Sequence, residues 1–101
     1  MTRTQPEARI VKAILDALNA LPQTYARKTH GNGYNSGWPD IVGVHRGRMI
    51  ALEVKQPGRD ATPMQRHELA KWRAAGALVG VAHDVDEAMA VIDDPLARAQ
   101  S

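Results

Sequence analysis

Two apolar, β-branched stretches joined by two residues lie in the middle of the chain and constrain its fold most strongly. Residues 39–45 and 48–55 read as strands, and Arg46-Gly47 between them fits a two-residue hairpin turn in which glycine tolerates a positive φ. If these two residues form the loop, positions whose numbers sum to 93 face each other. Asp40 then lies opposite Glu53, at the open end of the hairpin.

This pairing predicts that three ionisable side chains share one face of the sheet. Asp40 and Glu53 point to the same face because they are directly opposed, and strand alternation adds Lys55. Opposed like charges destabilise a sheet by a few tenths to about 1 kcal/mol, and the pKa of one carboxyl rises. A hard divalent cation such as Mg²⁺ removes this conflict. In the alternative interpretation, Asp40 caps the strand entrance, and Glu53 and Lys55 lie on the solvated side of an edge strand.

The residues around this predicted site resemble those of a known family. Gly37-Trp38-Pro39-Asp40, then Glu53-Val54-Lys55, then Thr62-Pro63-Met64-Gln65 follow the order seen in the VRR-NUC branch of the PD-(D/E)xK nucleases. The similarity extends over roughly residues 5 to 90. It implies a restriction-endonuclease-like fold and a Mg²⁺- or Mn²⁺-dependent nuclease activity. Short stand-alone members of the family come from bacteria and phages, so the resemblance also implies a cytoplasmic protein.

The remaining patterns predict an α/β domain with element order αβββαβα, in which helices flank a mixed sheet. A capping box from Thr4 to Glu7 opens the first helix, whose buried stripe is Ile10, Val11, Ile14, Leu15 and Leu18. A short strand spans residues 23–29, with Tyr25 as the inward residue. The hairpin follows and completes the first half of the fold.

The second half is predicted to contain two more helices and one strand. A capping box from Thr62 to Gln65 opens a helix that Gly76 terminates, and residues 77–82 form a buried strand. A third box, Asp84-x-x-Glu87, opens the last helix, with Val85, Ala88, Met89 and Ile92 inward. We expect one domain over residues 1–101, with a core of about 5–92 and a loose tail at 95–101.

Composition is compatible with this interpretation and excludes several others. The 101 residues carry a net charge of +2 with a pI near 9.3, which suits a polyanionic partner without forming a dense cationic arm. The absence of cysteine excludes disulfides and cysteine-based zinc fingers, and it fits a reducing compartment. No apolar run approaches the ~20 residues that span a bilayer. We therefore expect an intracellular protein with no membrane partner and no organic cofactor.

Two acids and a lysine are the candidate catalytic residues. Asp40 and Glu53 are the predicted metal ligands, and the resemblance adds the backbone carbonyl of Val54. A bound cation stabilises charge on a scissile phosphate and activates water near neutral pH. Lys55 would orient or deprotonate that water, or neutralise the phosphate.

Glu7 and Gln65 each have two explanations. Glu7 closes a capping box with Thr4, and Gln65 closes one with Thr62. The resemblance instead places a glutamate of the first helix near the metal, and a glutamine beside the active-site lysine and the DNA backbone. Gln65 also shares the inward helix face with Leu69 and Trp72, where an amide needs a partner. We predict functional roles for Glu7 and Gln65, with the caps as the alternative.

Basic residues in or beside the loops around the predicted site are the DNA-binding candidates. They are Arg27, Lys28, Arg59 and Arg66, together with His30, which precedes a glycine-rich loop leading into Asp40. Arg46 and Arg48 lie at the far end of the hairpin and are less suited to this role. The glycine-rich loop is no P-loop, because no Gly-Lys-Ser/Thr follows it.

The predicted function is a metal-dependent DNA endonuclease that selects branched or junction DNA with little sequence specificity. Two alternatives belong to other classes: a catalytically silent nucleic-acid-binding module, and an assembly protein whose hairpin acids are incidental. A specific DNA interface buries about 1,000–2,500 Å² of protein, a large share of so small a surface. We therefore expect a homodimer with two active sites.

Overall fold

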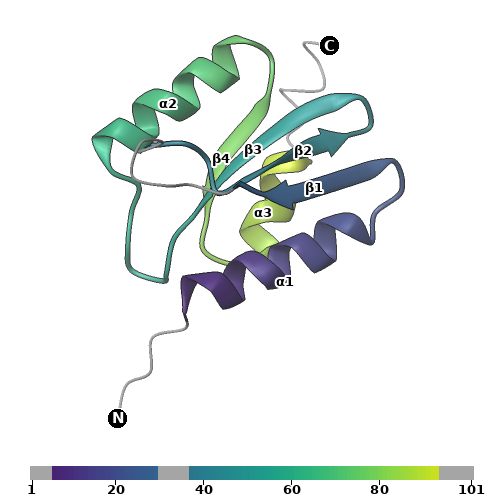
Figure 1. Cartoon of the computed structure of the whole chain (residues 1–101), viewed down its shortest axis with the longest axis horizontal. Helices are drawn as coiled ribbons and strands as arrows, with labels where there is room; N and C mark the ends of the chain where they lie inside the picture. Colours follow the sequence, from purple (N-terminus) through teal and green to yellow (C-terminus); the bar gives the residue numbers. More distant parts are fainter. Residues whose placement is uncertain (1–5, 30–36, 94–101) are drawn as a thin grey trace.

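The computed structural model describes residues 6–29 and 37–93. Within them the chain forms three helices and four strands, in the order expected from the sequence (Figure 1). The elements are α1 (Glu7–Asn19), β1 (Thr24–Lys28), β2 (Ile41–His45), β3 (Arg48–Val54), α2 (Pro63–Ala74), β4 (Leu78–Ala82) and α3 (Val85–Ile92). None of the described helices is long and apolar enough to cross a membrane.

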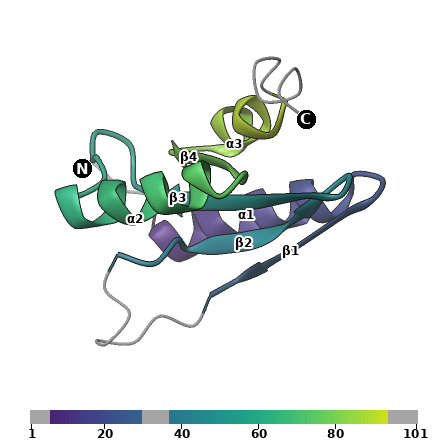
Figure 2. The ribbon, with the colours of Figure 1, turned by 90° about the horizontal axis from the view of Figure 1, so that it is seen from above.

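The four strands form one mixed sheet in the order β1-β2-β3-β4. The pairs β1–β2 and β2–β3 are antiparallel, and β4 runs parallel to β3 after the α2 crossover. Figure 2, which views the molecule from above, shows the sheet lying between helices. The predicted α/β, restriction-endonuclease-like architecture with a mixed sheet is confirmed.

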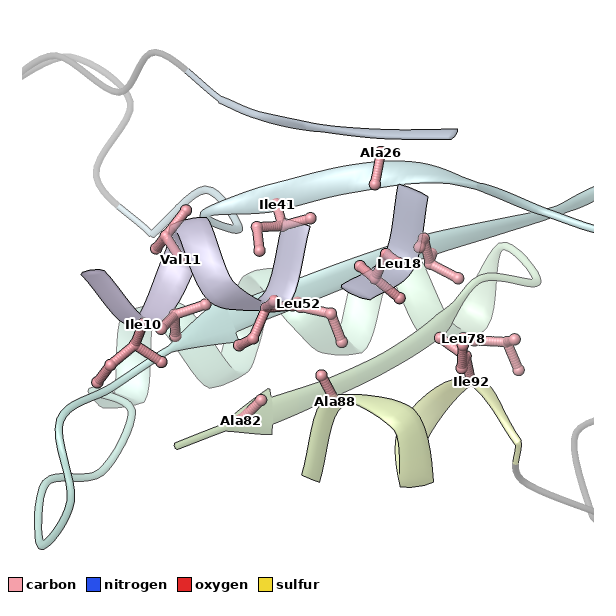
Figure 3. Close-up of a cluster of buried hydrophobic side chains, with 13 residues drawn as sticks. Ile10, Val11, Leu18, Ala26, Ile41, Leu52, Leu78, Ala82, Ala88 and Ile92 are labelled. Atoms are coloured by element: carbon pink, nitrogen blue, oxygen red, sulfur yellow. The ribbon is translucent and has the colours of Figure 1, made fainter. Parts of the chain in front are cut away.

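The larger core lies between the sheet and helices α1 and α3. It contains the predicted stripe of α1, with Ile14 and Leu18 fully buried, and the inward residues of α3. Figure 3 shows Val11 and Leu18 of α1 and Ala88 of α3 in one cluster with Ile41 and Leu52 from the two central strands. Burial of this apolar area, at roughly 25 cal/mol per Å², fixes both helices against one face of the sheet.

The opposite face carries a smaller core under α2. Leu69 packs there with Ala51 and Val79, alternate residues of β3 and β4 that point away from the larger core. Trp72 is half-buried in the same cluster. Helix α2 therefore packs over β3 and β4, whereas Tyr25 of β1 and Val44 of β2 remain exposed.

The hairpin has the predicted register. Ile41 pairs with Leu52 and His45 with Arg48, so paired positions sum to 93. Arg46 and Gly47 have φ values of 50° and 80°, as a type I′ turn requires at both central positions. This turn matches the right-handed twist of the flanking strands, which is why it determines the register so firmly.

The orientation of β1 differs from the prediction. Tyr25 is 61% exposed, and its neighbour Ala26 is the buried residue of this strand. Ala26 lies at the edge of the sheet, where its N–H donates to Oδ1 of Asn19 at 2.8 Å and its carbonyl accepts from Nδ2 of Asn19 at 3.0 Å. The end of α1 thus selects which face of β1 turns inward, a tertiary constraint that strand propensity alone does not contain.

The start of α1 also differs from the prediction. Pro6, with ψ 139°, is the N-cap, no side chain among the described residues caps the helix, and Glu7 is the first helical residue. The predicted capping box of Thr4 and Glu7 is therefore wrong, although Thr4 itself lies outside the described residues. Proline already restricts φ and lacks the N–H that a reciprocal cap would satisfy, so the chain needs no box here.

The caps of the other two helices are close to expectation. The box at α2 is complete, since Gln65 N–H donates to Oγ1 of Thr62 at 3.1 Å and Thr62 N–H donates to Oε1 of Gln65 at 2.9 Å. At α3, Asp84 accepts from Glu87 N–H at 2.8 Å, but the Glu87 carboxylate accepts from the N–H of His83 rather than from Asp84. The third box is therefore only half formed.

A substitution at Gly43 in β2 tests how closely β1 approaches the hairpin. A Cβ at this position would lie 2.7 Å from Cα and 2.8 Å from Cβ of Ala26, and it would also collide with the carbonyl of Tyr25. Gly43→Ala should lower the free energy of unfolding by about 1–3 kcal/mol or more, because backbone atoms cannot yield. Denaturant unfolding measures this loss. Val44→Ala, at the exposed next residue, should change stability by less than about 1 kcal/mol, and equal losses would contradict the close approach.

Candidate metal centre

Asp40 stands directly before β2, and neighbours on three sides fix its position. Its Oδ2 accepts a hydrogen bond from the N–H of Val54 at 2.8 Å, which joins the two sides of the hairpin beyond their last ladder pair. Its carbonyl accepts from the N–H of Thr29 at 2.9 Å. Pro39 and Ile41 on either side are buried. The Asp40 carboxylate is therefore held toward β3 by backbone that cannot move freely.

Glu53 lies one residue before the end of β3 and is the one buried charged residue in the described part of the chain, at 1% exposure. Its Oε1 has no hydrogen-bond partner among the described residues. Buried polar atoms are nearly always paired, and an unpaired one costs about 1–3 kcal/mol or more when charged. This oxygen is thus a strong indication of a ligand for the site.

A third carboxylate comes from α1. One oxygen each of Glu7, Asp40 and Glu53 lies within 4.8 Å of the others. The three residues are far apart in the sequence, and packing of α1 on the sheet brings Glu7 to the open end of the hairpin. Since Glu7 closes no capping box, its side chain is free of the structural role that the sequence suggested.

The environment raises the pKa of Glu53 to about 8. Burial is the largest cause, since it penalises the charged form, and the negative charge of Asp40 is the next. Lys55 acts in the opposite direction. Without a cation, burial and the charge of Asp40 therefore favour the protonated form of Glu53.

Lys55 follows the strand and points to the same site. Its Nζ lies 3.7 Å from Oε2 of Glu53, and its side chain is 16% exposed. Its N–H donates to the carbonyl of Ala82 at 3.1 Å, which extends the contact between β3 and β4. Lys55 thus lies against Glu53 and offsets part of the repulsion that raises the pKa of this carboxyl.

The donor set fits a hard divalent cation. All three side chains offer carboxylate oxygens, which Mg²⁺, Mn²⁺ and Ca²⁺ prefer, and none offers the sulfur or imidazole typical of zinc sites. The unpaired Oε1 of Glu53 and the raised pKa of its carboxyl both indicate that its negative charge is not compensated by the described residues. The residues present therefore fit the metal that the sequence predicted.

The structure brings together Asp40, Glu53, Lys55 and Glu7, and it gives Gln65 a different neighbour. Gln65 is half-buried in the first turn of α2, and its side-chain oxygen accepts from Thr62 N–H. The capping role of Gln65 is thus confirmed, and its proximity to Lys55 stays a prediction. Val54 is fully buried, and its N–H is the donor to Asp40. Its carbonyl as a ligand likewise stays a prediction.

The predicted DNA-binding residues lie on several surface segments. Arg27 and Lys28 are exposed on β1, and Nη1 of Arg27 donates to the hydroxyl of Tyr25 at 2.9 Å. Arg59 and Arg66 are exposed, and Arg66 forms an ion pair with Asp60. His30 lies outside the described residues. The roles of these residues remain predictions.

Two positioning contacts escaped sequence reasoning. Thr29 fixes the backbone before β2, since its Oγ1 donates to the carbonyl of Pro39 at 2.6 Å. His83 contacts both Glu87 and the carbonyl of Arg59, 24 residues earlier. Neither contact has a local signal, because the partners of Thr29 and the Arg59 partner of His83 are distant in sequence.

Comparison with solved structures identifies the fold. One structure, described as a VRR_NUC domain, is 28% identical with a TM-score of 0.70, and the match covers 88% of this chain and 96% of that one. A second, described as a VRR_NUC domain protein, is 18% identical with a TM-score of 0.71 and covers 89% and 87%. No protein-family model and no curated protein sequence matches the chain. The chain has the nuclease-type fold of the VRR-NUC family, which confirms the resemblance seen in its motifs.

The pKa of Glu53 predicts how the metal-free protein responds to pH. A carboxyl with an ordinary pKa near 4.5 when unfolded and about 8 when folded makes the wild type progressively less stable as pH rises between these values. Glu53→Gln removes this loss, by at most about 1.4 kcal/mol per pH unit. Denaturant unfolding in EDTA should show the free energy of unfolding of the variant rising relative to that of the wild type as the pH increases from 5 to 8.5. Glu68→Gln on α2 is the matched control, and identical pH slopes for wild type and Glu53→Gln would contradict the assignment.

Proposed function

We propose that this chain is a divalent-metal-dependent endonuclease that hydrolyses phosphodiester bonds in DNA. One observation carries the proposal: a buried glutamate, Glu53, has an unpaired oxygen within a cluster of three carboxylates, beside a lysine. The VRR-NUC fold supports the same class of function. Mg²⁺ and Mn²⁺ are the cations we propose, because oxygen ligands and phosphate substrates suit both.

Each residue of the cluster has a distinct role in the proposed reaction. Asp40 and Glu53, with the carbonyl of Val54, would hold the cation, and Glu7 would hold a water of its outer sphere or a second ion. Such a cation, when bound, neutralises the scissile phosphate and lowers the pKa of a coordinated water. Lys55 cannot act as a ligand while protonated, so it orients the attacking water or pairs with the phosphate.

The substrate is DNA with a branched or junction structure. The exposed basic residues Arg27, Lys28, Arg59 and Arg66 would contact phosphates rather than base edges. Gln65 at the start of α2 would contact the DNA backbone through its side-chain NH₂ group, because the capping box uses only the side-chain oxygen. Phosphate contacts carry no sequence information, so we expect selection by DNA shape.

A homodimer would give this small chain enough surface to hold such DNA. Two copies double the area available for the roughly 1,000–2,500 Å² that specific interfaces bury. They also present two active sites, as cutting opposed strands requires. Light scattering in solution tests this part of the proposal separately from cleavage.

Incubation with a panel of DNA structures tests the function directly. The panel contains single-stranded, duplex, flap and four-way-junction DNA, each with Mg²⁺, Mn²⁺ or EDTA. The proposal expects cleavage of a branched form with either metal and none in EDTA. Binding without cleavage would instead support a silent nucleic-acid-binding module, and neither binding nor cleavage would support an assembly protein.

Asp40→Asn and Lys55→Ala should separate ligand from catalyst. The asparagine side chain can still accept from Val54 N–H, so the fold should survive. Loss of the charge should lower metal affinity by at least the roughly 10- to 100-fold that follows from mutating the hydrogen-bond partner of a metal ligand. Lys55→Ala should keep the metal-dependent rise in Tm and lose about 100-fold or more in turnover. Lys12→Ala on the exposed face of α1 is the control. Lost metal affinity in Lys55→Ala with normal turnover at saturating metal would contradict its role.

Glu7→Gln tests whether the third carboxylate serves the metal. Glu7 closes no capping box, so the substitution should cost only the roughly 0.3–1 kcal/mol that a charge in a first helical turn contributes. Cleavage should fall tenfold or more, with weaker metal binding measured by calorimetry. Asp86→Asn, in the first turn of α3, controls for the helix-dipole effect. Equal cleavage by both variants would remove Glu7 from the site.

A further inference from the structure

His83 joins two segments that meet beside the end of β3. It lies in the turn between β4 and α3, and its ring contacts the loop of residues 55–62 that connects β3 to α2. Its Nε2 lies 2.6 Å from the carbonyl oxygen of Arg59, and its Nδ1 lies 2.7 Å from Oε1 of Glu87. The backbone N–H of His83 donates to the same Glu87 oxygen at 2.9 Å.

Both ring nitrogens face oxygens that only accept hydrogen bonds. A peptide carbonyl has no proton to donate, and neither has an ionised carboxylate. A neutral imidazole has one N–H, so it can satisfy only one of these two contacts. Both are satisfied together only when the ring is doubly protonated and cationic. The geometry therefore requires the imidazolium form.

The Arg59 carbonyl belongs to a tight turn that begins next to Lys55. Arg59 N–H donates to the carbonyl of Gln56 at 3.0 Å, and Gly58 has φ 83°, as the third position of a type II turn requires. The adjacent residue Ala82 accepts from Lys55 N–H at 3.1 Å. Residues 82 and 83 thus hold both ends of the segment from Lys55 to Arg59.

We propose that His83 is a positioning residue: its imidazolium clamps the turn of residues 56–59 to the start of α3 and so holds Lys55 and Arg59 in place for the reaction. The catalytic part of this inference rests on the proposed nuclease function. The clamp itself is a property of the fold and can be measured in the absence of any substrate.

The clamp depends on pH because of the charges around the ring. From α3, Glu87 faces it directly, and Asp84 caps the same helix; from the loop, Asp60 faces it and is itself paired with Arg66 of α2. The Arg59 carbonyl and Glu87 raise the pKa of His83 above its usual 6.5, and His83 holds the pKa of Glu87 below its usual 4.5. The clamp is complete between these two transitions and is lost as pH rises through the folded pKa of His83.

The contact to Arg59 is the one that deprotonation releases. Glu87 is charged and also accepts the backbone N–H of His83, so the remaining ring proton stays on Nδ1, where the charge-assisted bond is stronger. The Arg59 carbonyl then faces an unprotonated nitrogen. The turn of residues 56–59 should loosen while α3 remains capped by Asp84.

The first experiment follows the clamp in the metal-free protein by NMR. Titration of the His83 ring should give a pKa above 6.5, and Glu87→Gln should lower it, because the acceptor loses its charge. Amide hydrogen exchange at Arg59 should be slow below this pKa and, after correction for intrinsic exchange, severalfold faster above it. An ordinary pKa together with pH-independent protection would overturn the clamp. His67→Gln, at an exposed position of α2, is the control.

The second experiment tests positioning through the pH profile of kcat at saturating metal. His83→Gln is the informative variant, since its amide donates to a carbonyl without titrating. The kcat of the wild type should fall roughly tenfold as pH rises above the pKa of His83, because small displacements of catalytic groups slow the reaction. The kcat of the variant should show no such fall. Superimposable profiles would overturn the positioning role. Absence of cleavage under all conditions would refute the proposed function instead, with the NMR result on the clamp unaffected.

Discussion

The pairing of β2 with β3 is the constraint around which the rest of the candidate site is arranged. Both turn residues, Arg46 and Gly47, adopt positive φ, and the resulting type I′ turn permits one register. A shift by one residue would move every side chain of a strand to the other face and expose the core residues Ile41 and Leu52. The same register brings Asp40 against the backbone of Val54, so the stability of the hairpin and the geometry of the acids have one cause.

The candidate site contains an unfavourable electrostatic interaction, which the stability of the hydrophobic core offsets. Glu53 is buried on a strand whose remaining buried residues are apolar, and its repulsion by Asp40 is offset only partly by Lys55. Natural sequences remove such conflicts where they serve no purpose, because each lowers an already small stability. The proposed metal site rests on this conflict, because a single bound cation would resolve it.

The surroundings of the site are held by contacts between segments that are distant in sequence. Thr29 holds the backbone before Asp40, Ala82 holds the N–H of Lys55, and His83 holds the turn that follows. Each contact reaches from a strand end into a connecting loop, where the ladder no longer orders the chain. These contacts therefore order the connecting segments beside the strands that carry Asp40 and Glu53, and Lys55 lies where the regular structure ends.

Local patterns in the sequence sufficed for the register of the hairpin, the buried stripe of α1 and the complete cap of α2, because each depends on residues at most a few positions apart or on one turn. They also sufficed to bring Asp40, Glu53 and Lys55 to one end of the hairpin. Only tertiary packing decided the rest. The docking of α1 brought Glu7 to the acids and turned Ala26, not Tyr25, inward through Asn19. Burial raised the pKa of Glu53, and the sequence alone could not show this, because desolvation depends on which distant residues pack around the side chain.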